Sequence, residues 1–254
     1  MDSTWFRRFT TSDGHGPRLV CFPHAGGSAT AYLPLAKALP APLDVVAVQY
    51  PGRQDRYSEE PFTSLAGLVD AVAGRLAPEL AAEPERPYAL FGHSMGALVA
   101  FETARLLVER GLPEPRRLFL SGRRAPGPGP EPYGRGYDDA AVLADVRRLG
   151  GMDPSMLDDP EVLEMVLPAL RADYQALATY RWRKSAPLDI PITALIGDRD
   201  PMVTAVEACA WRERSRGDFA LEVFGGGHFY LTEHVERIAA TVAEQVAGAA
   251  VLTA

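Results

Sequence analysis

Short apolar runs alternate with longer helical stretches along this 254-residue chain, and this alternation limits the fold more than any other feature. Most runs are continuously apolar, which is typical of strands buried on both faces of a parallel sheet. The sequence therefore predicts an α/β fold with a mostly parallel, doubly wound sheet, to which residues 6–10 add an antiparallel edge strand. The expected strands are residues 18–22, 44–49, 88–91, 117–121, 192–196 and 221–224. The expected helices are residues 31–39, 64–82, 95–110, 203–216 and 235–247.

One segment interrupts the alternation. Residues 122–132 are rich in glycine and proline, which excludes a helix or a central strand. Beyond them, residues 138–182 read as helices with no strand between them, at 139–149, 159–167 and 170–182. An all-helical insertion between two strands typically covers the carboxyl edge of the sheet. We therefore expect a core of residues 1–124 and 183–254, with residues 125–182 inserted as a helical lid.

Composition and charge exclude several function classes. A formal net charge of −7 argues against a nucleic-acid-binding protein. No stretch approaches a membrane span, and the first ten residues lack the apolar region of a signal peptide. Cys21 and Cys209 have neither metal-ligand spacing nor a disulfide framework, which fits a reducing compartment. We expect a cytoplasmic monomer that uses no metal or other cofactor.

The strongest local motif is Gly92-His93-Ser94-Met95-Gly96, which matches G-x-S-x-G. It lies between a predicted strand and a predicted helix, the context in which this motif forms a nucleophile elbow. The small glycines allow a tight turn that lifts the Ser94 hydroxyl clear of the sheet, at a helix N-terminus that favours negative charge. The alternative role for Ser94 is a helix N-cap. Strand, elbow and helix together predict an α/β-hydrolase fold with Ser94 as its nucleophile.

A serine nucleophile needs a base, and the base needs an acid to orient it. His228 follows the last predicted strand and three glycines, and the chain order Ser, Asp, His is the one that this fold uses. His234, near the start of the last helix, is the alternative base. The acid is expected after the preceding strand, where Asp200 projects from the loop. Asp198 lies closer to the strand and is better suited to bracing that loop.

Two backbone N–H groups are expected to stabilise the oxyanion formed during acyl transfer. One belongs to Met95, the residue after the nucleophile. The second belongs to the glycine-rich loop at residues 23–28, where Ala25 is the favoured donor and Gly26 the alternative. A phosphate-binding loop is a weak alternative for this segment, since no G-K-[ST] follows.

Six motifs in order resemble the type II thioesterases of polyketide and nonribosomal peptide biosynthesis, and the resemblance covers nearly the whole chain. One small departure is Gly227, where an acidic residue more often precedes the histidine. The motifs are Phe22-Pro-His-Ala-Gly-Gly-Ser, Gln49-Tyr-Pro-Gly-Arg, Gly92-His-Ser-Met-Gly, Ser121-Gly-Arg-Arg-Ala-Pro, Gly197-Asp-Arg-Asp and Gly227-His-Phe-Tyr-Leu.

The resemblance implies an editing thioesterase. Such an enzyme hydrolyses stalled or wrongly primed acyl groups from the phosphopantetheine arm of acyl or peptidyl carrier proteins, through an acyl-enzyme on Ser94. Arg123 and Arg124 are candidates for contacts with an acidic carrier, or for local ion pairs. The apolar lid residues either face the acyl chain or bury one another: Met156, Leu163, Met165, Leu167, Leu170, Tyr174 and Leu177.

Three other functions remain open at this point. A small-molecule esterase or lipase would use the same triad, and a non-catalytic hydrolase scaffold would have lost part of it. A terminal thioesterase domain cut from a larger synthase would share the motifs as well. The sequence identifies neither the preferred acyl chain nor the residues that bind it.

Overall fold

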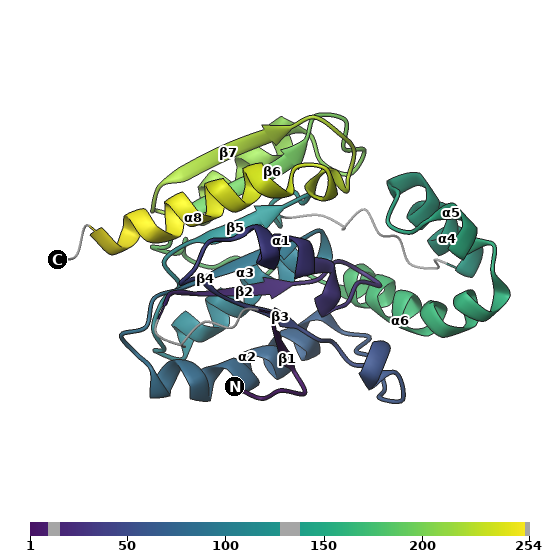
Figure 1. Cartoon of the computed structure of the whole chain (residues 1–254), viewed down its shortest axis with the longest axis horizontal. Coiled ribbons are helices and arrows are strands. Elements are labelled where there is room, and N and C mark those ends of the chain that lie inside the picture. Colours follow the sequence, from purple (N-terminus) through teal and green to yellow (C-terminus); the bar gives the residue numbers. More distant parts are fainter. Residues whose placement is uncertain (10–15, 128–137, 252–254) are drawn as a thin grey trace.

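The computed structural model describes residues 1–9, 16–127 and 138–251, and its centre is a seven-stranded sheet (Figure 1). The strand order is β1-β3-β2-β4-β5-β6-β7, with β1 antiparallel to β3 and every other pair parallel. This is the predicted α/β-hydrolase architecture. The strands are β1 (Phe6–Arg8), β2 (Arg18–Phe22), β3 (Asp44–Val48), β4 (Tyr88–His93), β5 (Leu118–Ser121), β6 (Ile192–Gly197) and β7 (Phe219–Phe224).

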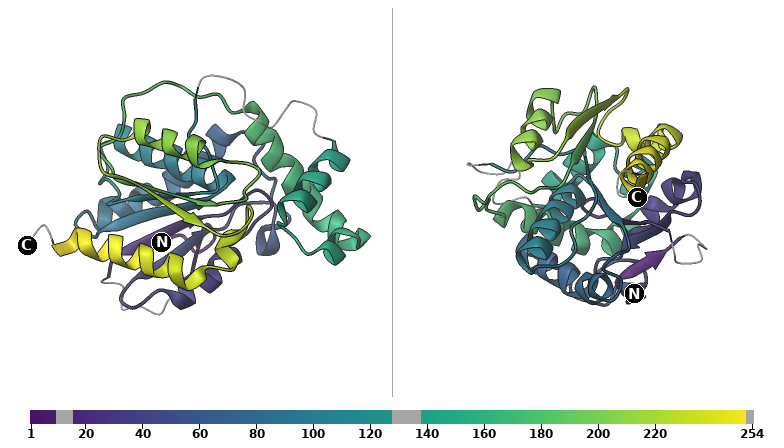
Figure 2. Two further views of the ribbon diagram at one scale, coloured as in Figure 1. Left: turned by 90° about the horizontal axis from the view of Figure 1, so that it is seen from above. Right: turned by 90° about the vertical axis from the view of Figure 1, so that its left-hand side faces the viewer.

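Helices cover both faces of the sheet (Figure 2). Because successive strand residues point to opposite faces, β2 divides its side chains between two cores. Val20 and Phe22 pack with α2 (Leu65–Ala82) and α3 (Met95–Glu109), whereas Leu19 and Cys21 pack with α1 (Leu33–Ala38) and α8 (Val235–Val251). Burial on both faces explains why the strand sequences are continuously apolar rather than alternating.

Several predicted boundaries shift in the structure. The expected helix at residues 203–216 is α7 (Ala205–Cys209) followed by a 3₁₀ turn, η3 (Ala210–Arg214). A shorter 3₁₀ turn, η1 (Ala29–Tyr32), precedes α1, and two more, η2 (Gln54–Arg56) and η4 (Tyr230–Thr232), lie in loops. The edge strand β1 ends at Arg8, while residue 10 of the predicted strand lies outside the described residues.

Three helices lie beyond the carboxyl ends of the strands: α4 (Asp139–Leu149), α5 (Pro154–Leu157) and α6 (Pro160–Thr179) (Figure 1). The prediction of separate helices at residues 159–167 and 170–182 is wrong, since α6 is continuous through Pro168. A proline inside a helix removes one backbone hydrogen bond. The following turns bury one face between Ala169 and Leu177, however, and this packing stabilises the helix. Residues 128–137 of the expected lid lie outside the described residues.

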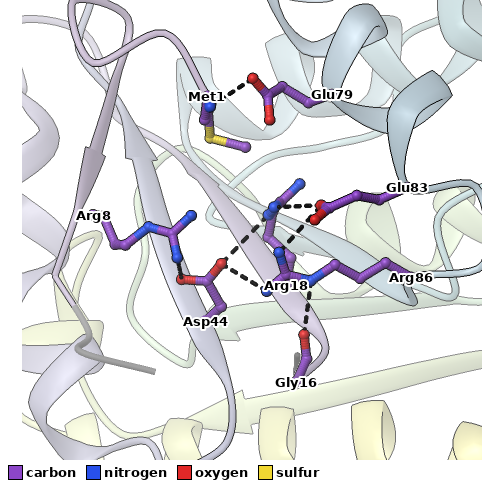
Figure 3. Close-up of polar contacts among 8 residues, drawn as sticks. All are labelled: Met1, Arg8, Gly16, Arg18, Asp44, Glu79, Glu83 and Arg86. Atoms are coloured by element: carbon purple, nitrogen blue, oxygen red, sulfur yellow. Dashed lines mark hydrogen bonds and ion pairs between the residues drawn. The ribbon is translucent and has the colours of Figure 1, made fainter. Parts of the chain in front are cut away.

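The opposite, amino edge of the sheet contains a buried charge network around Asp44 (Figure 3). The side chain of Asp44 is completely buried at the start of β3. Its carboxylate pairs with Nη2 of Arg86 at 2.8 Å, Nη1 of Arg8 at 3.1 Å and Nε of Arg18 at 3.5 Å. Arg18 and Arg86 also share Glu83. The network joins four segments, namely β1, β2, the start of β3 and the loop after α2, far from the residues predicted to carry the chemistry.

Replacing Asp44 by asparagine is expected to destabilise the fold by about 3 kcal/mol, because it leaves the buried Arg18 and Arg86 with only the exposed Glu83 as counter-charge. Urea unfolding followed by circular dichroism measures the loss. The exposed pair of Arg216 with Asp189 supplies the control, since Asp189→Asn is expected to leave the unfolding midpoint nearly unchanged. A native midpoint for Asp44→Asn would contradict the prediction.

Candidate active site

Ser94 lies in a strained turn between β4 and α3. Its φ of 56° and ψ of −116° are unusual for a residue with a side chain. The flanking glycines are required by contact: a Cβ on Gly92 would lie 2.1 Å from the carbonyl oxygen of Gly96, and one on Gly96 would lie 1.9 Å from that of Phe22. The Ser94 side chain makes no capping hydrogen bond to α3. This geometry fits an elbow serine better than the alternative role of helix N-cap.

Asp200 and His228 meet at the carboxyl ends of β6 and β7. Nδ1 of His228 lies 2.8 Å and 3.0 Å from the two carboxylate oxygens of Asp200, and both side chains are buried. A carboxylate accepts hydrogen bonds, so Nδ1 carries a proton, and the neutral form of this ring has its lone pair on Nε2. Among the residues that the structure describes, none is hydrogen-bonded to that buried Nε2. Ser94 and His228 line the same cavity.

The structure places the alternative acid and base elsewhere. Nε2 of His234 lies 2.7 Å from the carbonyl oxygen of Gly225, on an exposed part of the chain. Oδ1 of Asp198 accepts a hydrogen bond from the Gly226 N–H at 2.8 Å, which braces the loops after β6 and β7. Neither side chain lines the cavity that contains Ser94.

The two candidates for the second oxyanion donor are in different situations. The Gly26 N–H already donates to Oδ2 of Asp173 at 2.7 Å. Ala25 and Gly26 both line the cavity together with Ser94, so this occupied N–H is what separates them, and Met95 is the first residue of α3, directly after the elbow. The geometry therefore favours Ala25 over Gly26 beside Met95.

The cavity above Ser94 has a volume of about 490 Å³, including its opening. Leu170 and Tyr174 of α6 line it, as the sequence allowed, but Met156 and Met165 are exposed to solvent and Leu177 is buried in the core. Sequence reasoning missed four apolar residues of the wall that belong to α4, to the loop after it and to the segment after His228. These are Val146, Leu149, Met152 and Phe229.

Two further histidines lie beside His228 and stay neutral. Burial, together with His228 and Arg53, lowers the pKa of His24 to about 4. Burial also holds the pKa of His93 well below its usual range, and Nδ1 of His93 lies 2.9 Å from Oγ of Ser121. The His24 ring packs edge-on against Phe229, with 4.8 Å between ring centroids. Both imidazoles are therefore uncharged neighbours of His228, the candidate base.

Other parts of the chain add few candidate groups. Within residues 1–9, 16–127 and 138–251, no cluster of three His, Cys, Asp or Glu side chains could hold a metal ion. In that same portion, no helix has both the length and the apolar character needed to cross a bilayer. Arg123 is buried, which favours the local role over a contact with a carrier protein for this residue, whereas Arg124 is partly exposed.

Comparison with known proteins places this geometry in a family. Residues 17–246 match the sequence model of the Thioesterase domain. Thioesterase PikA5 of Streptomyces venezuelae is 44% identical over 245 residues, which are 95% of this chain and 85% of that protein. A probable cadicidin biosynthesis thioesterase of Streptomyces griseus is 42% identical over 240 residues, 94% of this chain and 65% of that protein.

Solved structures agree with the sequence comparison. The structure of the type II thioesterase BorB, from the borrelidin biosynthetic cluster, superposes with a TM-score of 0.82 at 46% identity. The match covers 96% of this chain and 98% of the BorB chain. The chain belongs to the thioesterase family, as a serine hydrolase of the α/β-hydrolase fold and of the type II thioesterases found in polyketide and nonribosomal peptide biosynthesis.

Proposed function

We propose that this enzyme edits carrier proteins by hydrolysing stalled or wrongly primed acyl groups from their phosphopantetheine arms. The observation that carries the proposal is the shared cavity: a serine on a strained elbow and an imidazole oriented by a buried carboxylate line one apolar chamber. An acyl thioester entering this chamber would meet both groups. Two relatives are named as a cadicidin biosynthesis thioesterase and as a type II thioesterase of the borrelidin biosynthetic cluster, and these names support a carrier-bound substrate.

In the proposed mechanism, the Ser94 oxygen attacks the thioester carbonyl while Nε2 of His228 takes the hydroxyl proton. The C–S bond then breaks, and the pantetheine sulfur leaves with that proton, which gives an acyl-enzyme. Water attacks the ester in the second half, again losing its proton to His228, and the free acid departs from a regenerated Ser94. Asp200 holds the tautomer and stabilises the imidazolium. The N–H groups of Ala25 and Met95 stabilise each oxyanion.

The helices after β5 form the acyl chamber in this proposal. Residues 125–182 act as a lid on a core of residues 1–124 and 183–254, and Val146, Leu170 and Tyr174 present apolar surface to the acyl chain. The enzyme works as a cytoplasmic monomer, with acyl and peptidyl carrier proteins as its partners and no cofactor. Among the described residues, the wall of the cavity is mostly apolar and includes no Asp, Glu, Lys or Arg, which suits varied acyl chains.

A panel of carrier proteins loaded with different acyl groups tests this function, with Ser94→Ala as the control. The native enzyme is expected to release free acid at least about 10³-fold faster than Ser94→Ala. Oxygen esters with the same acyl groups separate this role from a small-molecule esterase, because an editing enzyme hydrolyses the carrier-bound thioester in preference. Rates on the panel equal to those of Ser94→Ala would exclude the editing role.

A further inference from the structure

A buried ion pair contacts the backbone of the loop that carries Ala25. Arg53 lies in the loop after β3, and Asp173 lies on α6, 120 residues later. Their contact has two bonds: Nη1 lies 2.8 Å from Oδ2, and Nη2 lies 3.0 Å from Oδ1. Both side chains are almost fully buried, at 7% and 2% exposed. Such paired, two-bond contacts fix orientation as well as distance.

Each partner also binds the loop directly. Oδ2 of Asp173 accepts the Gly26 N–H at 2.7 Å, and Nη1 of Arg53 donates to the Gly27 carbonyl at 3.0 Å. The Gly27 N–H donates to the His24 carbonyl at 2.9 Å, which closes a turn around Ala25 and Gly26. One ion pair therefore binds the turn at two points, the Gly26 N–H and the Gly27 carbonyl. Ala25 lies between these bound residues and His24 in the sequence.

The helix that supplies Asp173 also packs tightly on this turn. Gly26 has a φ of +74°, and a Cβ there would lie only 2.4 Å from Cδ2 of Leu170. Leu170, Asp173 and Tyr174 are spaced for one face of α6. Leu170 and Tyr174 line the acyl cavity, while Asp173 lies between them in sequence and binds the turn. One stretch of α6 thus contacts both the acyl chamber and the oxyanion loop.

We propose that Arg53 and Asp173 are positioning residues for the oxyanion hole, which hold the turn so that the Ala25 N–H faces the carbonyl attacked by Ser94. This inference rests on the proposed roles of Ser94 and Ala25. An oxyanion hole acts only if its donors are already in place before the charge develops. The turn lies between the end of β2 and the start of η1, and Arg53 and Asp173 add buried hydrogen bonds to its Gly26 and Gly27 backbone groups.

Stability alone does not account for the pair. Desolvation largely offsets the attraction between buried charges, and an apolar pair of similar size is often as stable. A purely structural pair and a positioning pair therefore predict different outcomes when both charges are removed together. If the pair is purely structural, removing both charges restores stability and activity in parallel. If the pair positions the turn, removing both charges restores stability but leaves the chemical step slow.

The test compares Arg53→Met, Asp173→Leu and the double variant, using the acetyl thioester of N-acetylcysteamine as substrate. Each single variant is expected to lower both the unfolding midpoint and kcat. The double variant is expected to regain much of the midpoint, while its kcat per folded enzyme stays about 10- to 100-fold below native. KM should change by less than about threefold, because the ground state does not use the oxyanion hole. Native kcat in the double variant would overturn the proposal.

A conservative variant keeps the test decisive if the apolar variants fold poorly. Arg53→Lys retains the charge but loses the planar fork that serves Asp173 and Gly27 together. We expect a folded protein with kcat lowered by about 5-fold or more and an unchanged KM.

Asp44→Asn is the matched control, since it disturbs a buried ion network at the opposite edge of the sheet. It should lower the midpoint without lowering kcat per folded enzyme, and equal losses of kcat in both variants would overturn the proposal.

Inhibition by phenylboronic acid gives a second readout. Its tetrahedral adduct with a serine places a negatively charged oxygen where the oxyanion forms, so its inhibition constant should rise in Arg53→Lys in proportion to the fall in kcat. If Ser94→Ala still hydrolyses the acetyl thioester, the proposed mechanism fails. If hydrolysis depends on Ser94 but Arg53→Lys keeps the native kcat and the native inhibition constant for phenylboronic acid, only the positioning role fails.

Discussion

Replacing His228 by alanine is expected to lower kcat on an acetyl-loaded carrier protein by about 10⁶-fold. The expected loss is this large because, in the proposed mechanism, the imidazole serves both half-reactions, taking the proton from Ser94 and later from water. The geometry supports one role for each ring nitrogen: Nδ1 lies 2.8 Å from the Asp200 carboxylate, which leaves the lone pair of Nε2 for the substrate side. Single-turnover release of acetate from the loaded carrier measures the loss.

His234→Ala is the control for His228→Ala. Its side chain bonds to the Gly225 carbonyl and does not line the cavity, so kcat is expected to fall by less than about threefold. Near-ultraviolet circular dichroism must show that both variants are folded. If His228→Ala keeps a rate within about tenfold of native, His228 is not the base.

The sequence predicted the sheet well because strand burial is a local signal. β2 is entirely buried, and its predicted and observed bounds agree at residues 18–22. The lid was predicted less well because tertiary contacts decide it. The sequence predicted a break between residues 167 and 170, but α6 continues through Pro168, stabilised by buried residues that pack against the rest of the fold. No local pattern reports such packing.

The candidate triad was accessible from sequence for a related reason. Ser94, Asp200 and His228 each follow a strand, and the carboxyl ends of parallel strands meet at one edge. The contact of Arg53 with Asp173 joins residues 120 apart, which no spacing rule predicts. One signal was present nonetheless: Asp173 lies at helical spacing from Leu170 and Leu177, on the apolar face of α6, and charged residues there are rarely buried without a partner.

Asp200→Asn is expected to lower kcat by about 10⁴-fold with little change in fold. The asparagine side chain fills the same space, and its carbonyl can still accept the Met202 N–H that Oδ1 accepts at 2.8 Å. Its amide, however, would donate a hydrogen bond to Nδ1 of His228, which moves the imidazole proton to Nε2. The base then faces Ser94 with a proton in place of a lone pair, and no charge remains to stabilise the imidazolium. Measurements of kcat and KM on the acetyl-loaded carrier should show the effect almost entirely in kcat.

Asp198→Asn separates this role from simple bracing of the same loop. Asp198 holds the Gly226 N–H at 2.8 Å through one oxygen, and an asparagine retains an acceptor there. We therefore expect a kcat within about threefold of native, although the substituted residue lies only two positions from Asp200. The opposite ranking of the two variants would assign the acid to Asp198. That result would require the loop after β6 to rearrange, because in this structure only Asp200 of the two carboxylates contacts His228.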